Sequence, residues 1–184
     1  MALTINIEEE LRFVKENQMD KEHAIEYVAN VLGSKGAKIY EYSGVRFVAI
    51  LNGNGKSNLA ITFGDENMTM EFATQSARFA YGDEDDLVAH TEKFLSGELC
   101  AVEFYHGETA LFGGSRIMPE KPFDTTSELA AWYACGNAEA EKSIDEFLKK
   151  NEIVVVCAVW TVEDDLMERS SADGKMIVLG REVI

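Results

Sequence analysis

The sequence predicts an α+β protein in which a largely antiparallel sheet is accompanied by an N-terminal helical hairpin and flanking helices. The first observation is a change of period, from helical spacing up to residue 33 to alternation from residue 37 onward. The second is that short β-rich segments are separated by turns that contain glycine. The third is the composition, because 46% hydrophobic and 27% charged residues are typical of a globular chain.

Two amphipathic segments open the chain. Asn6 and Glu9 form a predicted capping box for a helix that ends near Asn17. Asp20 is predicted to cap a second helix, which ends at Gly33, where a left-handed residue is expected. The two helices are predicted to form the hairpin.

Four segments then predict an antiparallel meander, namely 38–42, 45–52, 59–63 and 68–73. In the last of them Met68, Met70 and Phe72 alternate with smaller or polar residues, so one face should be buried. A helix is predicted over 83–96, because acids crowd its first turn and Gly97 follows its end.

The rest of the chain predicts a hairpin, two helices and two strands. The hairpin pairs 99–105 with 110–118, and both prolines follow it, so a subdomain boundary near 118–125 is expected within a single domain 1–184. Thr125 and Asn137 are predicted to cap the two helices. The closing strands, 153–160 and 175–179, are expected to join the same sheet.

Charge limits the classes of partner. The chain has 33 acidic and 17 basic residues, a net charge of −16, and residues 61–120 hold twelve acids against three bases. A negative field repels phosphate backbones and anionic lipid but attracts cationic proteins. The start of the chain lacks a secretion signal and no apolar run approaches the ~20 residues that span a bilayer. We therefore expect a cytoplasmic protein with reduced cysteines that binds neither nucleic acid nor membrane.

No motif predicts a cofactor or a metal ion. The segment that ends in Gly55-Lys56-Ser57 follows a strand, but Ile50 stands where a phosphate-binding loop needs glycine. The acids at 65–66 and 83–86 lack the alternation and central glycine of a calcium loop. The three histidines show no helical pairing typical of zinc sites. No catalytic residue is assigned, and the chain is expected not to be an enzyme.

The alternative is a small-ligand protein or enzyme with a pocket under the helix 83–96. Its chemical group would be Cys135, which precedes a predicted helix, or His106, which lies in a predicted turn. Neither residue has a base or an orienting partner at sequence level.

Residues 58–118 resemble a family of small uncharacterised bacterial cytosolic proteins, many of them like the immunity proteins that accompany secreted polymorphic toxins. The residues that carry the resemblance are Met68-Thr-Met-Glu-Phe72, the acidic helix, Glu98-Leu-Cys-Ala-Val-Glu-Phe-Tyr105 and Gly113-Gly114-Ser115. Relatives carry a His-x-His pair where this chain has Gln75-Ser76-Ala77-Arg78-Phe79, so no active-site residue is carried over. The resemblance implies an α+β fold and a toxin-binding role.

The leading hypothesis is a non-enzymatic, immunity-like protein that docks an acidic surface on a cationic partner such as a toxin. The expected contacts crowd the acidic middle of the chain: Glu71, Asp83, Glu84, Asp85 and Asp86. A homodimer is the other assembly considered, because strands at the edges of the sheet need covering.

Overall fold

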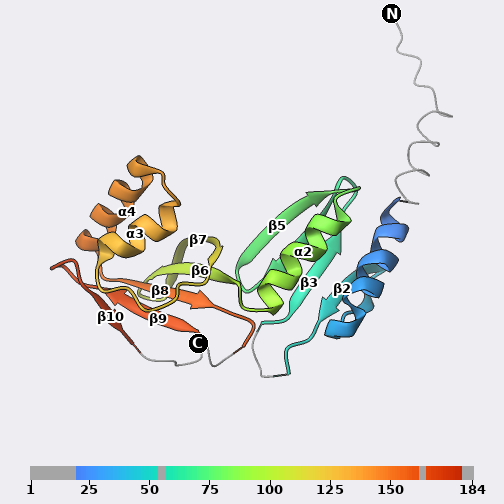
Figure 1. Cartoon of the computed structure of the whole chain (residues 1–184). Helices are drawn as coiled ribbons and strands as arrows, with labels where there is room; N and C mark the ends of the chain where they lie inside the picture. The colour runs from blue at the N-terminus through green and yellow to red at the C-terminus, as the bar shows by residue number, and fades with distance from the viewer. Residues whose placement is uncertain (1–19, 54–56, 162–164, 180–184) are drawn as a thin grey trace, which may run out of the picture. The chain divides into compact units, whose positions relative to one another are not determined.

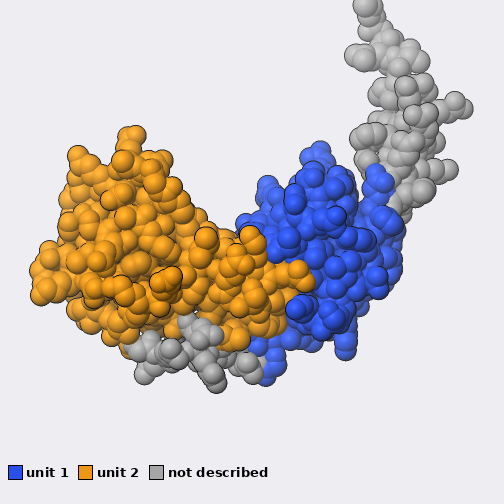
Figure 2. Space-filling model, in the orientation of Figure 1, with its two compact units in different colours: residues 1–53, 57–72, 76–91 blue, residues 54–56, 73–75, 92–184 orange. Residues whose placement is uncertain are grey.

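A computed structural model describes residues 20–53, 57–161 and 165–179 of the chain (Figure 1). The protein is α+β, with two five-stranded antiparallel sheets and their helices. It divides into two compact units, of which the first comprises residues 1–53, 57–72 and 76–91 and the second residues 54–56, 73–75 and 92–184 (Figure 2). Among the described residues, no helix is both long enough and apolar enough to cross a bilayer.

The sheet of unit 1 is a meander whose strands follow one another in sequence order. They are β1 (Lys38–Tyr42), β2 (Val45–Ile50), β3 (Leu59–Phe63), β4 (Asn67–Phe72) and β5 (Gln75–Ala80). The first four are the predicted strands. β5 was not predicted, because its sequence QSARFA has a single large apolar residue and no β-branched one.

One face of this sheet forms the core of unit 1. The alternation places Val48, Ile61 and Met70 side by side across three strands, and all three are buried. Helix α2 (Glu84–Leu95) and a helix over residues 20–31 supply the buried side chains that complete this core, among them Leu87 and Ile25. The α2 prediction is confirmed.

The N-terminal hairpin is corrected to a single helix in the described chain. Its first arm, near Asn6 to Asn17, falls outside the described residues. Asp20 already lies within the helix instead of capping it. The helix continues into a 3-10 turn, η1 (Leu32–Lys35), and the left-handed residue is Gly36, with φ of 89°, and not Gly33. Leu32 is fully buried, which holds the extra turn against the core beyond the predicted end.

The sheet of unit 2 has the order β10-β9-β8-β6-β7. Its strands are β6 (Leu99–His106), β7 (Thr109–Ile117), β8 (Ile153–Ala158), β9 (Leu166–Ser170) and β10 (Met176–Val178). The closing strands were expected to extend the first sheet, but β8 pairs with β6 instead, and β9 lies between β8 and β10. β6 pairs with β7 and β8 and not with a strand of the first sheet, so one predicted sheet becomes two.

Helices α3 (Thr126–Ala134) and α4 (Ala138–Lys150) contribute buried side chains to the core of unit 2. Phe104 stacks on Phe112 with ring centroids 4.4 Å apart and meets the Tyr133 ring edge-on at 4.9 Å. Both predicted caps are confirmed, since Thr125 accepts from the amide of Glu128 and Asn137 from that of Ala140. The proline-containing connector lies within this unit.

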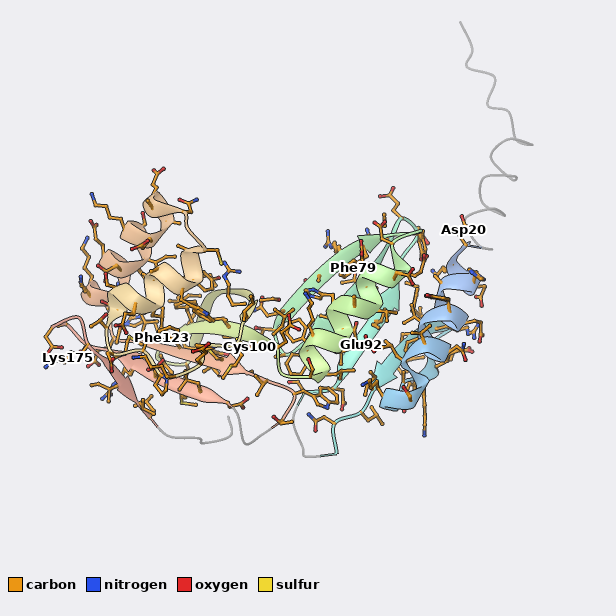
Figure 3. All side chains as sticks on the ribbon, in the orientation of Figure 1. Asp20, Phe79, Glu92, Cys100, Phe123 and Lys175 are labelled. Atoms are coloured by element: carbon orange, nitrogen blue, oxygen red, sulfur yellow. The ribbon has the colours of Figure 1, made fainter. Side chains whose placement is uncertain are left out.

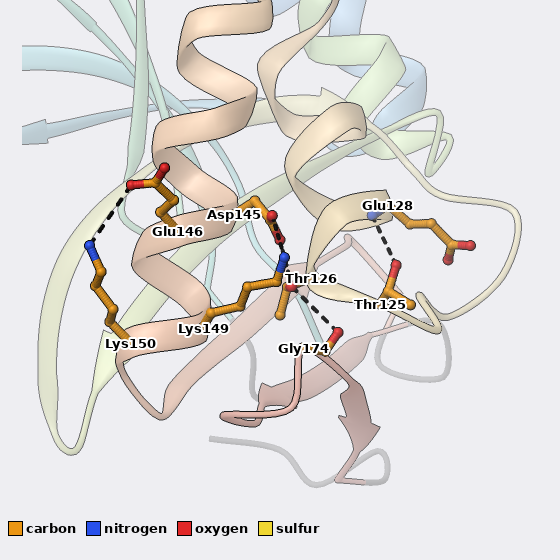
Figure 4. A network of polar contacts seen from close by, with 8 residues as sticks. All are labelled: Thr125, Thr126, Glu128, Asp145, Glu146, Lys149, Lys150 and Gly174. Atoms are coloured by element: carbon orange, nitrogen blue, oxygen red, sulfur yellow. Dashed lines mark hydrogen bonds and ion pairs between the residues drawn. The ribbon is translucent and has the colours of Figure 1, made fainter.

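A polar network joins the two helices to the turn before β10 (Figure 4). The hydroxyl of Thr126, which is fully buried, donates to the Asp145 carboxylate at 2.6 Å. Its oxygen also lies 3.4 Å from the carbonyl of Gly174. Lys149 donates to the same carboxylate at 2.6 Å. Burial favours a higher pKa for Asp145, but the hydrogen bonds from Lys149 and Thr126 bring that pKa below its ordinary value.

Candidate functional site

Strand topology brings three chain reversals to one end of unit 1. The β1–β2 turn at 43–44, the β3–β4 turn at 64–66 and the β5–α2 junction at 81–83 all lie at this end, because the intervening connections reverse at the other. The hydroxyl of Tyr81 donates to the carbonyl of Gly64 at 2.7 Å, which ties the junction to the β3–β4 turn. In Figure 3, Asp20 and Phe79 lie toward this end and Glu92 lies toward the other end of α2.

Carboxylates gather there from three elements. The N-terminal helix belongs to the same end, because Lys21 lies 4.0 Å from Asp65 and the Tyr27 hydroxyl donates to Asp85 in the first turn of α2. We call this set the acidic end, and its nine members are Asp20, Glu22, Glu26, Asp65, Glu66, Asp83, Glu84, Asp85 and Asp86.

The basic side chains within the acidic end are paired internally. The Arg46 guanidinium, near the start of β2, binds Glu26 at 2.7 Å and also binds Glu22. This contact forms because Arg46 lies two residues before the buried Val48 on β2, so both side chains point to the same face, which the N-terminal helix covers. The hydrogen bond from Arg46 to Glu26 is the largest of the effects that raise the pKa of Arg46.

The field of these carboxylates also acts on nearby phenols. Burial, followed by the charges of Asp65 and Glu84, raises the pKa of Tyr81 to about 12. The hydrogen bond to Asp85 raises the pKa of Tyr27. Both phenols therefore remain protonated donors at neutral pH, and they hold the junction in place without reducing its negative charge.

The helix dipole helps to keep this charge in place. Glu84, Asp85 and Asp86 occupy the first turn of α2, where the partial positive charge of a helix N-terminus stabilises carboxylates. Glu84 additionally accepts a hydrogen bond from the amide of Gly82 at 3.0 Å. The structure thus places Asp83 to Asp86 together at the start of α2, with Glu84 half-buried and the three aspartates exposed.

Glu71 does not join the acidic end. It alternates with Met70 and Phe72, so its side chain projects from the face of the sheet opposite to the core. It is also paired with Ala60, near the end of the sheet where β4 turns into β5. Sequence proximity grouped Glu71 with the helix acids, whereas strand direction separates them.

Sequence reasoning missed the contribution of the N-terminal helix and treated the acids at 65–66 as an isolated turn. Asp20, Glu22 and Glu26 lie outside the acidic middle third, which hid them from a count of charge along the chain. Asp65 could have been placed from the predicted meander itself, because every second turn of an antiparallel meander lies at the same end of the sheet.

The residues of the alternative hypothesis lie apart in unit 2. Cys135 is exposed at the end of α3 with φ of 50°, two residues before the cap of α4, and its sulfur lies 3.5 Å from the carbonyl oxygen of Trp132. His106 is exposed at the end of β6 and pairs with Thr109 across the hairpin. In the described part of the chain, no three His, Cys, Asp or Glu side chains lie close enough to hold a metal ion.

The element that comes after the glycine-containing segment 52–57 is a strand, β3. A phosphate-binding loop needs a helix in that position, with its N-terminus facing the anion. The strand that follows therefore does not support nucleotide binding at this segment. Gly55 and Lys56 themselves lie outside the described residues.

Two carboxyl groups are buried in unit 2. Glu103 accepts from the amide and hydroxyl of Thr74, at 3.2 and 2.6 Å, and from the hydroxyl of Tyr105. That last bond is the leading cause that raises the pKa of Tyr105 to about 12. Glu168 is 1% exposed and accepts from the amide of Phe123 at 3.0 Å. Desolvation raises the pKa of Glu168 to about 7, despite this bond.

A pocket of about 390 Å³ also lies in unit 2, beside the proline-containing connector. Ser96 and Gly97, which follow α2, form part of its wall. No residue of the helix itself lines this pocket, and neither do Cys135 and His106, the residues of the alternative hypothesis. Comparison with protein-family models, with curated proteins and with solved structures found no match.

Proposed function

We propose that this chain is a non-enzymatic, immunity-like binding protein whose acidic end docks on a cationic protein partner such as a nuclease toxin. The observation that carries the proposal is the convergence of nine carboxylates from the N-terminal helix, the β3–β4 turn and the start of α2 on one end of unit 1. Lys21 and Arg46 are engaged with acids of the same set, so the end presents an excess of negative charge.

The proposed mechanism is electrostatic occlusion. A nuclease must present a cationic groove to the phosphate backbone of its substrate, and carboxylates held in that groove would exclude the substrate. Such charges accelerate encounter and choose the partner more than they add affinity. Two contacts hold the acidic end in place: the hydrogen bond from Tyr81 to the Gly64 carbonyl and the ion pair between Arg46 and Glu26 of the N-terminal helix. Such fixed placement limits the conformational entropy lost on docking.

The test is calorimetric titration of the chain with a nuclease-toxin domain encoded beside its gene. The variant Asp65→Lys/Asp86→Lys reverses two exposed acids, of which Asp65 makes only a 4.0 Å ion pair. The matched control is Glu139→Lys/Glu152→Lys, which makes the same change in total charge on exposed residues of unit 2. We expect binding by the wild type and the control, and a loss of tenfold or more in the first variant.

Two results would contradict the proposal. One is the absence of heat with the wild-type chain, and the other is an equal loss of affinity in both double variants, which would show that net charge matters and its location does not. A further variant, Glu71→Lys, separates the acidic end from the opposite face of the sheet, and we expect it to bind as the wild type does.

A homodimer joined through the β7 edge is less favoured. The backbone amide of Met118 pairs with Glu98, so residues 113, 115 and 117 of the edge strand β7 direct their backbone groups away from β6. Trp132 donates to the carbonyl of Ile117 at 3.1 Å, and Arg116 to that of Ser115 at 2.7 Å. Two acceptors of this edge are thus occupied by side chains, which discourages pairing with another strand. Light scattering that reports twice the chain mass would favour the dimer.

A further inference from the structure

The pocket beside the connector has a mixed lining, in which polar groups expose somewhat more surface than apolar groups do. Its volume of about 390 Å³ lies within the range of roughly 300–1,000 Å³ typical of small-molecule sites. The apolar lining residues come from the connector, from the ends of β8 and β9, and from β10: Met118, Pro119, Pro122, Val159, Leu166 and Val178. Val159 is 1% exposed, so at least one wall is continuous with the core of unit 2.

The polar groups around these walls favour positive charge. Glu120 and Asp165 line the pocket, and the Asp165 carboxylate is fixed by a hydrogen bond of 2.8 Å from the amide of Val159. Lys121 is the basic lining residue, but its ammonium group binds Asp124 at 3.1 Å. The lining thus contains two acidic residues against one basic residue, and the basic one is already paired with an acid outside the lining, which gives the lining an excess of negative charge.

Helix α2 adds to this negative charge. It ends at Leu95, so Ser96 and Gly97 bring the carboxyl end of the helix to the pocket wall, where the helix dipole carries partial negative charge. The hydroxyl of Ser96 and the amide of Gly97 donate to the carbonyls of Lys93 and Phe94, which fixes this turn in place.

We infer that this pocket binds a small organic cation, a primary amine or guanidinium group carried on an apolar stem. The stem would displace water from Leu166, Val178 and the prolines, while the head would meet Glu120 and Asp165. Anions are disfavoured by the same carboxylates and by the net charge of −16. The inference concerns unit 2 and does not depend on the function proposed for the acidic end.

The test is a chemical-shift titration of the full chain, followed by ¹H–¹⁵N NMR, with n-butylamine, n-pentylamine and n-hexylamine. Each added CH₂ buried in the pocket should tighten binding about fourfold. The shifted amides should include those of Val159, Leu166 and Val178. Hexan-1-ol and hexanoate are the matched neutral and anionic probes, and we expect both to bind more weakly than hexylamine.

Variants locate the charge effect. Glu120→Gln should weaken hexylamine binding about two- to fivefold, as for other exposed ion pairs, and leave hexan-1-ol unaffected. Asp165→Asn retains the oxygen that accepts from Val159 and should weaken hexylamine in the same sense. The control, Glu108→Gln, changes an exposed acid in the β6–β7 turn and should have no effect.

Three results would overturn the inference. They are equal binding of hexylamine and hexan-1-ol, amide shifts confined to residues outside the pocket, and an affinity for the alkylamines that does not change with chain length. A preserved amide spectrum of each variant in the absence of probe identifies those that remain folded, and the wild-type comparison among the probes holds without any variant.

Discussion

Glu168 should make the stability of unit 2 fall as the pH rises. Its carboxyl group is 1% exposed and accepts one hydrogen bond from the Phe123 amide, and desolvation, together with the charge of Asp124, raises its pKa from 4.5 to about 7. A carboxyl group whose pKa is raised by folding stabilises the folded state below its unfolded pKa, and that stability is lost as the pH rises through its folded pKa. The relevant window therefore runs from about pH 4.5 to above pH 7.

The magnitude follows from the size of this shift. At 1.36 kcal/mol per pKa unit, a rise from 4.5 to about 7 corresponds to about 3 kcal/mol that the ionised carboxylate costs the folded state near pH 8. The variant Glu168→Gln cannot ionise, and its amide oxygen can still accept from Phe123. The unfolding free energy of the variant relative to the wild type should therefore increase by about 3 kcal/mol between pH 4.5 and pH 8.

Urea unfolding monitored by tryptophan fluorescence is the appropriate assay, because both tryptophans of the chain, Trp132 and Trp160, belong to unit 2. The control is Glu152→Gln, an exposed carboxyl group of the same unit, for which the difference from the wild type should stay within about 0.5 kcal/mol at each pH. A difference between Glu168→Gln and the wild type that is constant from pH 4.5 to pH 8, or that shrinks, would refute the reasoning.

Three other predictions concern unit 2. Thr126→Val should lower the unfolding free energy by about 1–2 kcal/mol, because it removes a buried hydroxyl that donates to Asp145, whereas Ser127→Ala should be nearly neutral; urea unfolding measures both. Of the three thiols only Cys135 is exposed, so a chromogenic disulfide reagent should titrate one thiol in the native chain and three in denaturant. Gly113→Ala should lower the melting temperature markedly, because its Cβ would lie 2.3 Å from the Val102 carbonyl oxygen, and an unchanged melting temperature would contradict this close approach.

Local sequence patterns predicted most elements because burial of one face and charge at the helix start are determined by residues close together in sequence. The alternation in Met68, Met70 and Phe72 identified a buried face, and the acids before Leu87 identified the start of α2. β9 was missed because its sequence LMERS contains two charged residues, of which Glu168 is buried by pairing with β8 and by contact with the connector. Local propensity carries no information about such a tertiary partner.

The division into two sheets and the composition of the acidic end depend on long-range placement. No local signal in the sequence of β8 specifies that it pairs with β6 instead of β1, because the choice of partner strand depends on residues far away in the chain. The helix acids Glu22 and Glu26 join the acidic end through Arg46. In sequence, Arg46 is separated from Glu22 by 24 positions and from Glu26 by 20. The same topology carries Glu71 away, although it lies closer in sequence to Asp83 than the helix acids do.

The most direct test of the central claim is the rate at which the chain associates with the adjacent nuclease-toxin domain as a function of salt, measured by stopped-flow fluorescence. If the acidic end makes the encounter, the rate constant of the wild type should fall steeply with ionic strength, and Asp65→Lys/Asp86→Lys should lose most of that dependence while Glu139→Lys/Glu152→Lys keeps it. The same salt dependence in both double variants would contradict the claim.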